Sequence, residues 1–292
     1  MATFPSPSSP SSATKTHRQY SFLVTTTKLP ILKSDPIDAL GARLGIPIPE
    51  MIFGDNLLSL THVPSGWSLS FSAEPALDLV DKTGASMLKV AYASEWSATR
   101  EKTSAGIKEV VKPFDWSYST SYRGTETRGA NGEALAKKKK AGEGKEGKEG
   151  KEEKAEKAEQ IPLELLRRRD PILFADEVVL YESELDDNGI SVLSVKVRVM
   201  EQRMLILCRF FMRLDNVVVR VRDTRVYADF GDEKVIREWT SREDKFENVK
   251  RNLYMSGLMP DAITVALRDS NQIANLLPVV EHEVESVSLK SA

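Results

Sequence analysis

The segment "MLILCRFFMRLDNVVVRVRDTRVY" (204–227) is the feature that most limits what this chain can fold into. Two apolar, alternating runs flank Asp215-Asn216, a pair suited to a two-residue hairpin loop. Successive side chains of a strand point to opposite faces, so one face of this hairpin must be core. Strands of this length need partners, and the chain must therefore build a sheet around them.

The hairpin also carries several arginines. With a two-residue loop, Arg209 faces Arg222, and the same face also holds Phe211, Arg213, Val218 and Arg220. The opposite face then holds the apolar residues Cys208, Phe210, Met212, Val219 and Val221. Like charges directly opposite each other are destabilising, so acidic groups must lie near these arginines.

Two sources for those acidic groups remain open. The chain itself has 43 acidic residues, and arginine stems can cover apolar surface while their charged ends stay in water. An acidic peptide or the rim of another protein would also suit, because the guanidinium fork binds carboxylates in bidentate fashion. Different arginines can use different sources.

The rest of the chain extends the sheet and adds helices. Alternation predicts strands within 19–26, 56–62, 67–72, 87–93, 115–124, 177–181, 191–200 and 234–240. Helical patterns cover 34–44 (Ser34 as cap, Gly45 as stop), 75–80, 94–100, 161–170, 242–253 (Ser241 and Asp244 as a capping box) and 270–289 with a break at Pro278. The prediction is an α+β fold: antiparallel β-sheets packed as a two-layer sandwich with helices on the outside.

Composition divides the chain into four parts. Residues 1–16 are rich in Ser, Pro and Thr and are expected to be a disordered arm. Residues 17–289 are expected to form one domain, interrupted by a Lys/Glu/Gly-rich insertion at 126–160. That insertion has almost no apolar side chains, so burial cannot offset the entropy of ordering it. Residues 290–292 are a short tail.

Charge and cysteine content exclude several classes of protein. A net charge of -2 argues against a dedicated nucleic-acid binder. No apolar run is long enough to span a membrane, and the N-terminus lacks the apolar core of a secretory signal. A single cysteine, Cys208, fits a reducing compartment, so we expect a cytoplasmic protein, with the nucleus as a second location.

Catalytic patterns are missing. The three histidines His17, His62 and His282 do not have metal-ligand spacing, and Cys208 is expected to be a buried thiol in mid-strand. "GEGKEGKE" has the glycine spacing of a phosphate loop but lacks the hydroxyl that binds Mg²⁺. The acidic run 176–187 lacks a calcium-loop pattern. We therefore expect no enzyme activity, no cofactor and no metal.

Several long motifs resemble one known family. They are "EMIFGDNLL", "MLKVAYASEW", "PFDWSYSTSYRGT", "LFADEVVLYESELDDNGISVLSVKVRVM", "RFFMRLDNVVVRVRDTRVY" and "REWTSRE". In this order they resemble the TIP-forty-one-like (TIPRL) family, regulators of type 2A protein phosphatases in TOR signalling. The resemblance runs from about Tyr20 to Pro278, interrupted by the insertion.

The resemblance implies a function. Members are non-catalytic, bind the catalytic subunits of type 2A and related phosphatases, and oppose TOR output. It also implies association with the phosphatase-associated alpha-four-type protein, and we expect a monomer. Type 2A catalytic subunits end in an acidic tail with aromatic and leucine side chains, to which arginine forks and apolar pockets would be complementary.

The resemblance also implies where the partner binds. The family's contact surface includes the end of the strand "VRDTRVY", the segment "REWTSRE" and the start of the helix after the variable loop. Here these supply Ile161, Arg220, Val221, Asp223, Arg225, Tyr227 and Trp239. The chain departs from its relatives at Pro75, Val221 and Trp239. Trp239 could face the core or the surface, and Asp223 and Arg225 could be structural or in direct contact.

Two rival functions remain. The arginine-bearing sheet face could bind single-stranded nucleic acid, with Tyr118, Tyr122 and Tyr227 as stacking platforms. A small-ligand barrel or an unknown enzyme would need a pocket lined by His62 and the acidic run. Under the family interpretation, replacing Asp223 and Trp239 together is expected to weaken a phosphatase complex without unfolding the chain.

Overall fold

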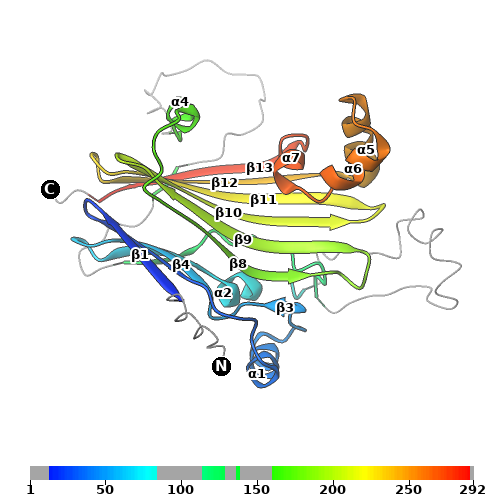
Figure 1. Ribbon diagram of the computed structural model, residues 1–292. Helices are drawn as coiled ribbons and strands as arrows, with labels where there is room; N and C mark the ends of the chain where they lie inside the picture. The colour runs from blue at the N-terminus through cyan, green and yellow to red at the C-terminus, as the bar shows by residue number, and fades with distance from the viewer. Residues whose placement is uncertain (1–12, 84–113, 129–135, 139–159, 290–292) are drawn as a thin grey trace, which may run out of the picture.

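The computed structural model describes residues 13–83, 114–128, 136–138 and 160–289 as two antiparallel sheets with helices around them (Figure 1). The predicted strand 87–93 and helix 94–100 lie outside the described residues, as do residues 1–12 of the expected arm and most of the insertion. Strand β1 begins at Thr14, inside the segment expected to be the arm, and strand β6 begins at Thr125, beside the insertion's expected start.

The smaller sheet has five strands in the order β1-β2-β4-β5-β6. Burial alternates residue by residue along its three central strands, as expected for a sheet with one buried face. The bounds are Thr14–Gln19 for β1, Phe22–Thr27 for β2, Leu57–His62 for β4, Trp67–Ser72 for β5 and Thr125–Thr127 for β6.

The larger sheet has eight strands in the order β3-β8-β9-β10-β11-β12-β13-β7. Its central strands are long, and the β10–β11 hairpin lies in the middle, paired with β9 on one side and β12 on the other. The bounds are Met51–Ile52 (β3), Ala136–Lys138 (β7), Phe174–Ser183 (β8), Gly189–Val199 (β9), Arg203–Leu214 (β10), Val218–Asp229 (β11), Lys234–Lys245 (β12) and Val279–Ser288 (β13).

The main core lies between the two sheets. It joins residues before and after the insertion, such as Phe22 and Phe71 of the smaller sheet with Val195 and Phe210 of the larger one. These side chains are at most 2% exposed. The prediction of an antiparallel two-layer α+β sandwich is therefore confirmed.

The helices lie outside this sandwich, and two groups cover the far face of the larger sheet (Figure 1). We call this face, turned away from the smaller sheet, the outer face. Helices α5, α6 and α7 pack on one end of it through Phe211, Val219 and Val221. Short helix α4 follows Ile161, which packs on the other end with Tyr227. The bounds are Ser34–Leu44 (α1), Ala73–Asp78 (α2), Leu163–Arg167 (α4), Phe246–Met255 (α5), Pro260–Ala266 (α6) and Ser270–Ala274 (α7).

Helix α1 matches its prediction except at its first residue. It ends before Gly45, whose φ of 70° is the left-handed cap that glycine adopts without strain. The expected Ser34 cap is wrong, because Lys33 holds the N-cap position without a side-chain hydrogen bond.

Three other sequence predictions are wrong. Residues 115–124 form no strand: the alternating Ser and Thr side chains are mostly buried and hydrogen-bonded, as in the Thr120 hydroxyl that donates to the Ala76 carbonyl. The expected capping box before α5 is instead the end of β12, where Ser241 and Asp244 still pair with β11. Residues 279–288 form strand β13 rather than helix, because Pro278 ends the helical segment and the following residues pair with β12.

The predicted register of the β10–β11 hairpin is also wrong, by one residue. The loop has three residues, Asp215 to Val217, and Asn216 takes the left-handed conformation at φ 62°. Arg209 therefore faces Asp223 instead of Arg222. The added residue moves the whole of β11 to the opposite faces: Val219 and Val221 lie on the outer face, and Arg220 and Arg222 lie on the inner one.

We expect Gly189→Ala to destabilise the fold. A Cβ atom at Gly189 would lie 1.9 Å from the carbonyl oxygen of Arg213, and its φ of +157° disfavours other residues. The free energy of unfolding should fall by about 2–3 kcal/mol in urea titration. Gly231→Ala is the matched control, since its Cβ would lie 3.5 Å from the Asp229 side-chain oxygen, and it should be near neutral. Equal stability of both variants would contradict the close packing at Gly189.

We expect Asp176→Asn to reduce stability at neutral pH and to flatten its loss in acid. The Asp176 carboxylate on β8 is only 5% exposed, accepts a hydrogen bond from Thr26 at 2.7 Å and pairs with Lys28, so it connects the two sheets. Burial opposes ionisation, but these hydrogen bonds outweigh it, and the pKa of Asp176 lies below 3.8.

A lowered folded-state pKa gives stability that is present above the unfolded pKa of about 4 and is lost as the pH falls through the folded value. Asp176→Asn should therefore cost on the order of 1–2 kcal/mol at pH 7 and less at pH 3. Asp38→Asn, on the exposed side of α1, is the control. A pH-independent loss in Asp176→Asn would contradict the ionic contribution.

Candidate functional site

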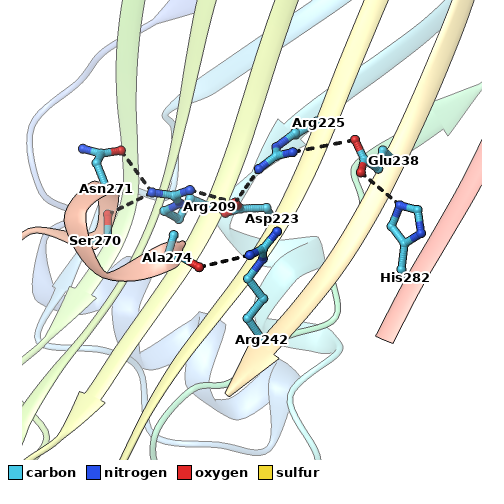
Figure 2. Close-up of polar contacts among 9 residues, drawn as sticks. All are labelled: Arg209, Asp223, Arg225, Glu238, Arg242, Ser270, Asn271, Ala274 and His282. Carbon is cyan, nitrogen blue, oxygen red and sulfur yellow. Dashed lines mark hydrogen bonds and ion pairs between the residues drawn. The ribbon is translucent and has the colours of Figure 1, made fainter. Parts of the chain in front are cut away.

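A band of charged side chains crosses the outer face between the two helical ends. We call it the polar band and define it as Arg209, Asp223, Arg225, Glu238, Arg242 and His282 (Figure 2). Strand alternation places these residues on one face, on neighbouring strands β10 to β13. Three arginines face two carboxylates, so with neutral His282 the band has a formal charge of +1 (three minus two).

The fixed centre of the band is the pair Arg209 and Asp223. Arg209 donates from Nε and Nη2 to the two carboxylate oxygens of Asp223, each at 2.7 Å. Arg209 Nη1 also donates to the Asn271 side-chain oxygen at 3.0 Å, at the start of α7. The Asp223 side chain is 1% exposed, so this bidentate pair is buried and holds α7 on the sheet.

Arg225 is held much more loosely. Its guanidinium nitrogens lie 3.7 Å from Asp223 and 3.8 Å from Glu238, which is too far for hydrogen bonds. The side chain is 30% exposed. Glu238 instead receives the close contact of His282 Nε2 at 2.9 Å. Arg225 therefore has guanidinium donors available for a carboxylate from outside.

Apolar groups border the polar band on both sides. Toward α5–α7 the border consists of Phe211 and Val221, which pack against the buried side chains of these helices. Toward α4, Ile161, Tyr227 and Ile236 form a small cluster of their own. Burial and the neighbouring Asp229 raise the pKa of Tyr227 to about 12, so its hydroxyl stays protonated and donates to Asp229 at 3.1 Å.

Five of the seven residues expected at the contact surface come together on the outer face. They are Ile161, Val221, Asp223, Arg225 and Tyr227. Arg220 and Trp239 lie on the inner face instead. Arg220 donates to Glu243 at 2.5 Å and to Ser119 at 2.6 Å, and Trp239 is 4% exposed beneath the Arg123 guanidinium at 4.3 Å.

Four residues around the band were not anticipated: Glu238, Arg242, Asn271 and His282. Alternation in "KVIREWT" puts Glu238 on the face opposite Trp239. Because the sequence did not settle which way Trp239 faces, it did not place Glu238 on the outer face either. Asn271 and the Ala274 carbonyl, which accepts from Arg242 at 3.2 Å, come from α7. The sequence patterns of the strands give no information on the position of α7, so they could not reveal that α7 folds back over the sheet.

Most of the hairpin's arginines pair with acidic groups of the chain itself. Besides the Arg209 pair, Arg213 donates to Asp215 at 2.6 Å and Arg220 to Glu243. Arg222 is partly buried on the inner face, where loss of contact with water lowers its pKa to about 10. The tightly held arginines therefore pair with acidic groups of the chain itself, whereas the loosely held Arg225 remains open to a second molecule.

Catalytic chemistry has little support in the described parts of the chain. Burial raises the pKa of the Cys208 thiol, which keeps it protonated and unreactive. His62 is 1% exposed and bonded to Ser65, while His282 belongs to the polar band. Within the described ranges, no three His, Cys, Asp or Glu side chains are grouped for a metal ion. No described helix combines the length and apolarity needed to cross a membrane.

Comparison with known proteins gives the family directly. The model of the TIP41-like family matches residues 51–250. The chain is 37% identical over 275 residues to the human "TIP41-like protein", covering 93% of this chain and 89% of the relative. It is 35% identical over 281 residues to the "Type 2A phosphatase activator TIP41" of Saccharomyces cerevisiae, covering 90% of this chain and 72% of the relative.

The similarity extends to a relative with lower identity. The "Type 2A phosphatase activator tip41" of Schizosaccharomyces pombe is 29% identical over 254 residues, which is 87% of this chain and 90% of that protein. The residues matched by the family model run from β3 to β12, and they include the β10–β11 hairpin and every residue of the polar band except His282. This chain belongs to the TIP41-like family.

Proposed function

We propose that the chain is a non-catalytic regulator that binds the catalytic subunit of type 2A-family serine/threonine phosphatases. Its family membership supports this, because two of its relatives are named type 2A phosphatase activators. The position of the contact surface is supported by the environment of Arg225. Its guanidinium is partly exposed, lies between apolar borders and has no close carboxylate partner within the described structure.

The polar band matches the charge of an acidic tail. A carboxylate can take the donors that Arg225 does not use at short range, and Arg242 adds a second cation to the band. Ile161 and Tyr227 at the α4 border are at most 5% exposed, so they fix this edge of the band by packing rather than offering apolar surface to the tail. The buried Arg209–Asp223 pair keeps this surface in place. We propose that the acidic C-terminal tail of the phosphatase binds along the band.

The remaining parts of the proposal follow from the family resemblance. We propose that the chain acts as a monomer in the cytoplasm and nucleus, in TOR signalling. Association with the phosphatase-associated alpha-four-type protein is part of the same proposal. Regulation is proposed through binding alone, with no reaction catalysed by this chain.

The nucleic-acid alternative is not favoured. Tyr118, Tyr122 and Tyr227, which would have to stack on bases, are all at most 7% exposed. Tyr118 and Tyr122 lie in the core between the sheets, whereas Tyr227 is on the outer face. They therefore do not form one stacking platform.

Reversal of the charge at Arg225 should weaken phosphatase binding. Arg225→Glu places a carboxylate where the acidic tail is proposed to lie, so Kd should rise at least about tenfold in a titration against a purified type 2A catalytic subunit. Removal of the subunit's C-terminal tail should abolish the difference between the variant and the wild type. Arg18→Glu, on the exposed edge strand β1, is the charge-matched control and should bind normally.

Normal binding of Arg225→Glu to a subunit with its full tail would refute the contact surface. Equal binding with and without the tail would keep phosphatase binding but move the site elsewhere. No binding by any form would refute the proposed function.

Asp223→Asn should act mainly through stability. It leaves Arg209 largely buried without its carboxylate, which typically costs about 3–5 kcal/mol. Urea titration should show this loss, and Asp215→Asn, at the partly exposed Arg213 pair, should cost much less. The combined Asp223 and Trp239 replacement is thus expected to disturb folding, contrary to the sequence-based expectation, since both side chains are buried. An unchanged unfolding curve for Asp223→Asn would contradict the anchoring role of the pair.

A further inference from the structure

A hollow lies beyond the polar band, between α5, α6 and the turn of the β10–β11 hairpin. Its volume is about 640 Å³, within the range of pockets that bind ligands or short peptide segments. We call it the helical groove. One face of each helix lines it: Phe246, Glu247, Lys250, Arg251 and Tyr254 from α5, and Pro260, Ile263 and Thr264 from α6, together with Leu267 directly after α6.

The floor of the helical groove is apolar and rigid. Phe246, Ile263 and Leu267 are at most 7% exposed and belong to the core that fixes α5–α7 to the sheet. Arg213 strengthens this arrangement, because it pairs with Asp215 and donates to the Leu267 carbonyl at 3.2 Å. Tyr254 lies at the rim and is 66% exposed, an unusual position for a large aromatic side chain.

The rim of the helical groove is basic. Four cations line it, Arg213, Lys250, Arg251 and Arg268, against the two acids Asp215 and Glu247, which leaves a formal charge of +2 (four minus two). Arg213 is already neutralised by Asp215. The other three cations are held weakly or not at all.

Lys250 lies 3.9 Å from Glu247, and both side chains are more than half exposed, so solvent screens this pair. Arg251 donates to the neutral side chain of Asn248 at 2.9 Å. Arg268, which follows α6, is exposed and makes no ion pair within the part of the chain that the structure describes. Lys250, Arg251 and Arg268 can therefore bind carboxylates from another molecule without losing strong internal partners.

We propose that the helical groove docks an acidic segment of a partner protein, one that places one or two apolar side chains on the floor and carboxylates at the rim. The floor accounts for affinity through burial, and Lys250, Arg251 and Arg268 account for selection of acidic over basic segments. Grooves between helices with such a floor commonly take peptides that present apolar residues at helical spacing. This site is separate from the polar band and does not rest on the proposed phosphatase function.

A second copy of the chain fits less well, because two basic rims would repel each other. Nucleic acid also fits less well, because the groove combines an apolar floor with the carboxylates of Asp215 and Glu247. Both occupants are outcomes of the experiment below.

The experiment titrates the full chain into fluorescein-labelled dodecapeptides and follows fluorescence anisotropy. The probe peptide consists of Asp and Glu with Leu and Phe four positions apart. One control peptide replaces Leu and Phe by Ala at the same charge, and another replaces the acids by Lys. Saturable binding of the probe is expected, with at least tenfold weaker binding of both controls.

Two variants of the chain locate the site. Thr264→Trp puts a bulky side chain into the helical groove and should weaken probe binding at least tenfold. Val265→Trp changes the next residue of α6, which is 67% exposed and does not line the groove, and should leave binding unchanged. Both sites are exposed on α6, so similar unfolding curves are expected for the two variants.

The proposal is overturned if the probe does not bind, if the alanine control binds equally well, or if both tryptophan variants behave alike. Sedimentation of the chain alone that shows a dimer lost only in Thr264→Trp would assign the groove to a second copy. Tighter binding of a fluorescein-labelled oligothymidylate than of the probe would assign it to nucleic acid. Each of these results would overturn the acidic-segment assignment.

Discussion

The three-residue loop of the β10–β11 hairpin is the constraint on which the rest of the structure depends. It fixes a register in which Arg209 lies opposite Asp223, so that two charges on neighbouring strands neutralise each other inside the protein. A loop one residue shorter would set Arg209 against Arg222 and bring Val219 and Val221 to the face that Arg220 and Arg222 now occupy. Helices α5–α7 would then lose the apolar surface on which they pack.

The same register divides the arginines into two functional groups. Those on the inner face, such as Arg220, hold the segment 114–122 against the larger sheet through Ser119. Those on the outer face belong to two candidate binding surfaces: Arg225 to the polar band and Arg213 to the helical groove. One hairpin thus supports the core on one side and two separate candidate binding surfaces on the other.

Much of the architecture could be predicted from local pattern. Alternation and turn residues predicted the two-layer antiparallel sandwich, and the Gly45 stop of α1 was correct, because both depend on short-range constraints. The hairpin register could not be derived, since Asp215-Asn216 suits a two-residue loop as well as the observed one. Strand β13 was mistaken for helix because Val280, Val284 and Val287 are four and three residues apart, as on one face of a helix. The direction in which Trp239 faces depends on the same register, so it could not be derived either.

The ends of the charged insertion have a consequence for experiments. Strand β7 pairs with Val284–Ser286 at the edge of the larger sheet, and Ile161 packs against Tyr227 on the outer face of that same sheet. The chain between these two points thus leaves and returns at anchors near the polar band. A fluorophore or affinity tag inserted between Lys138 and Gln160 would join the fold at these two anchors. It would report on events at the outer face while both anchors keep their own contacts.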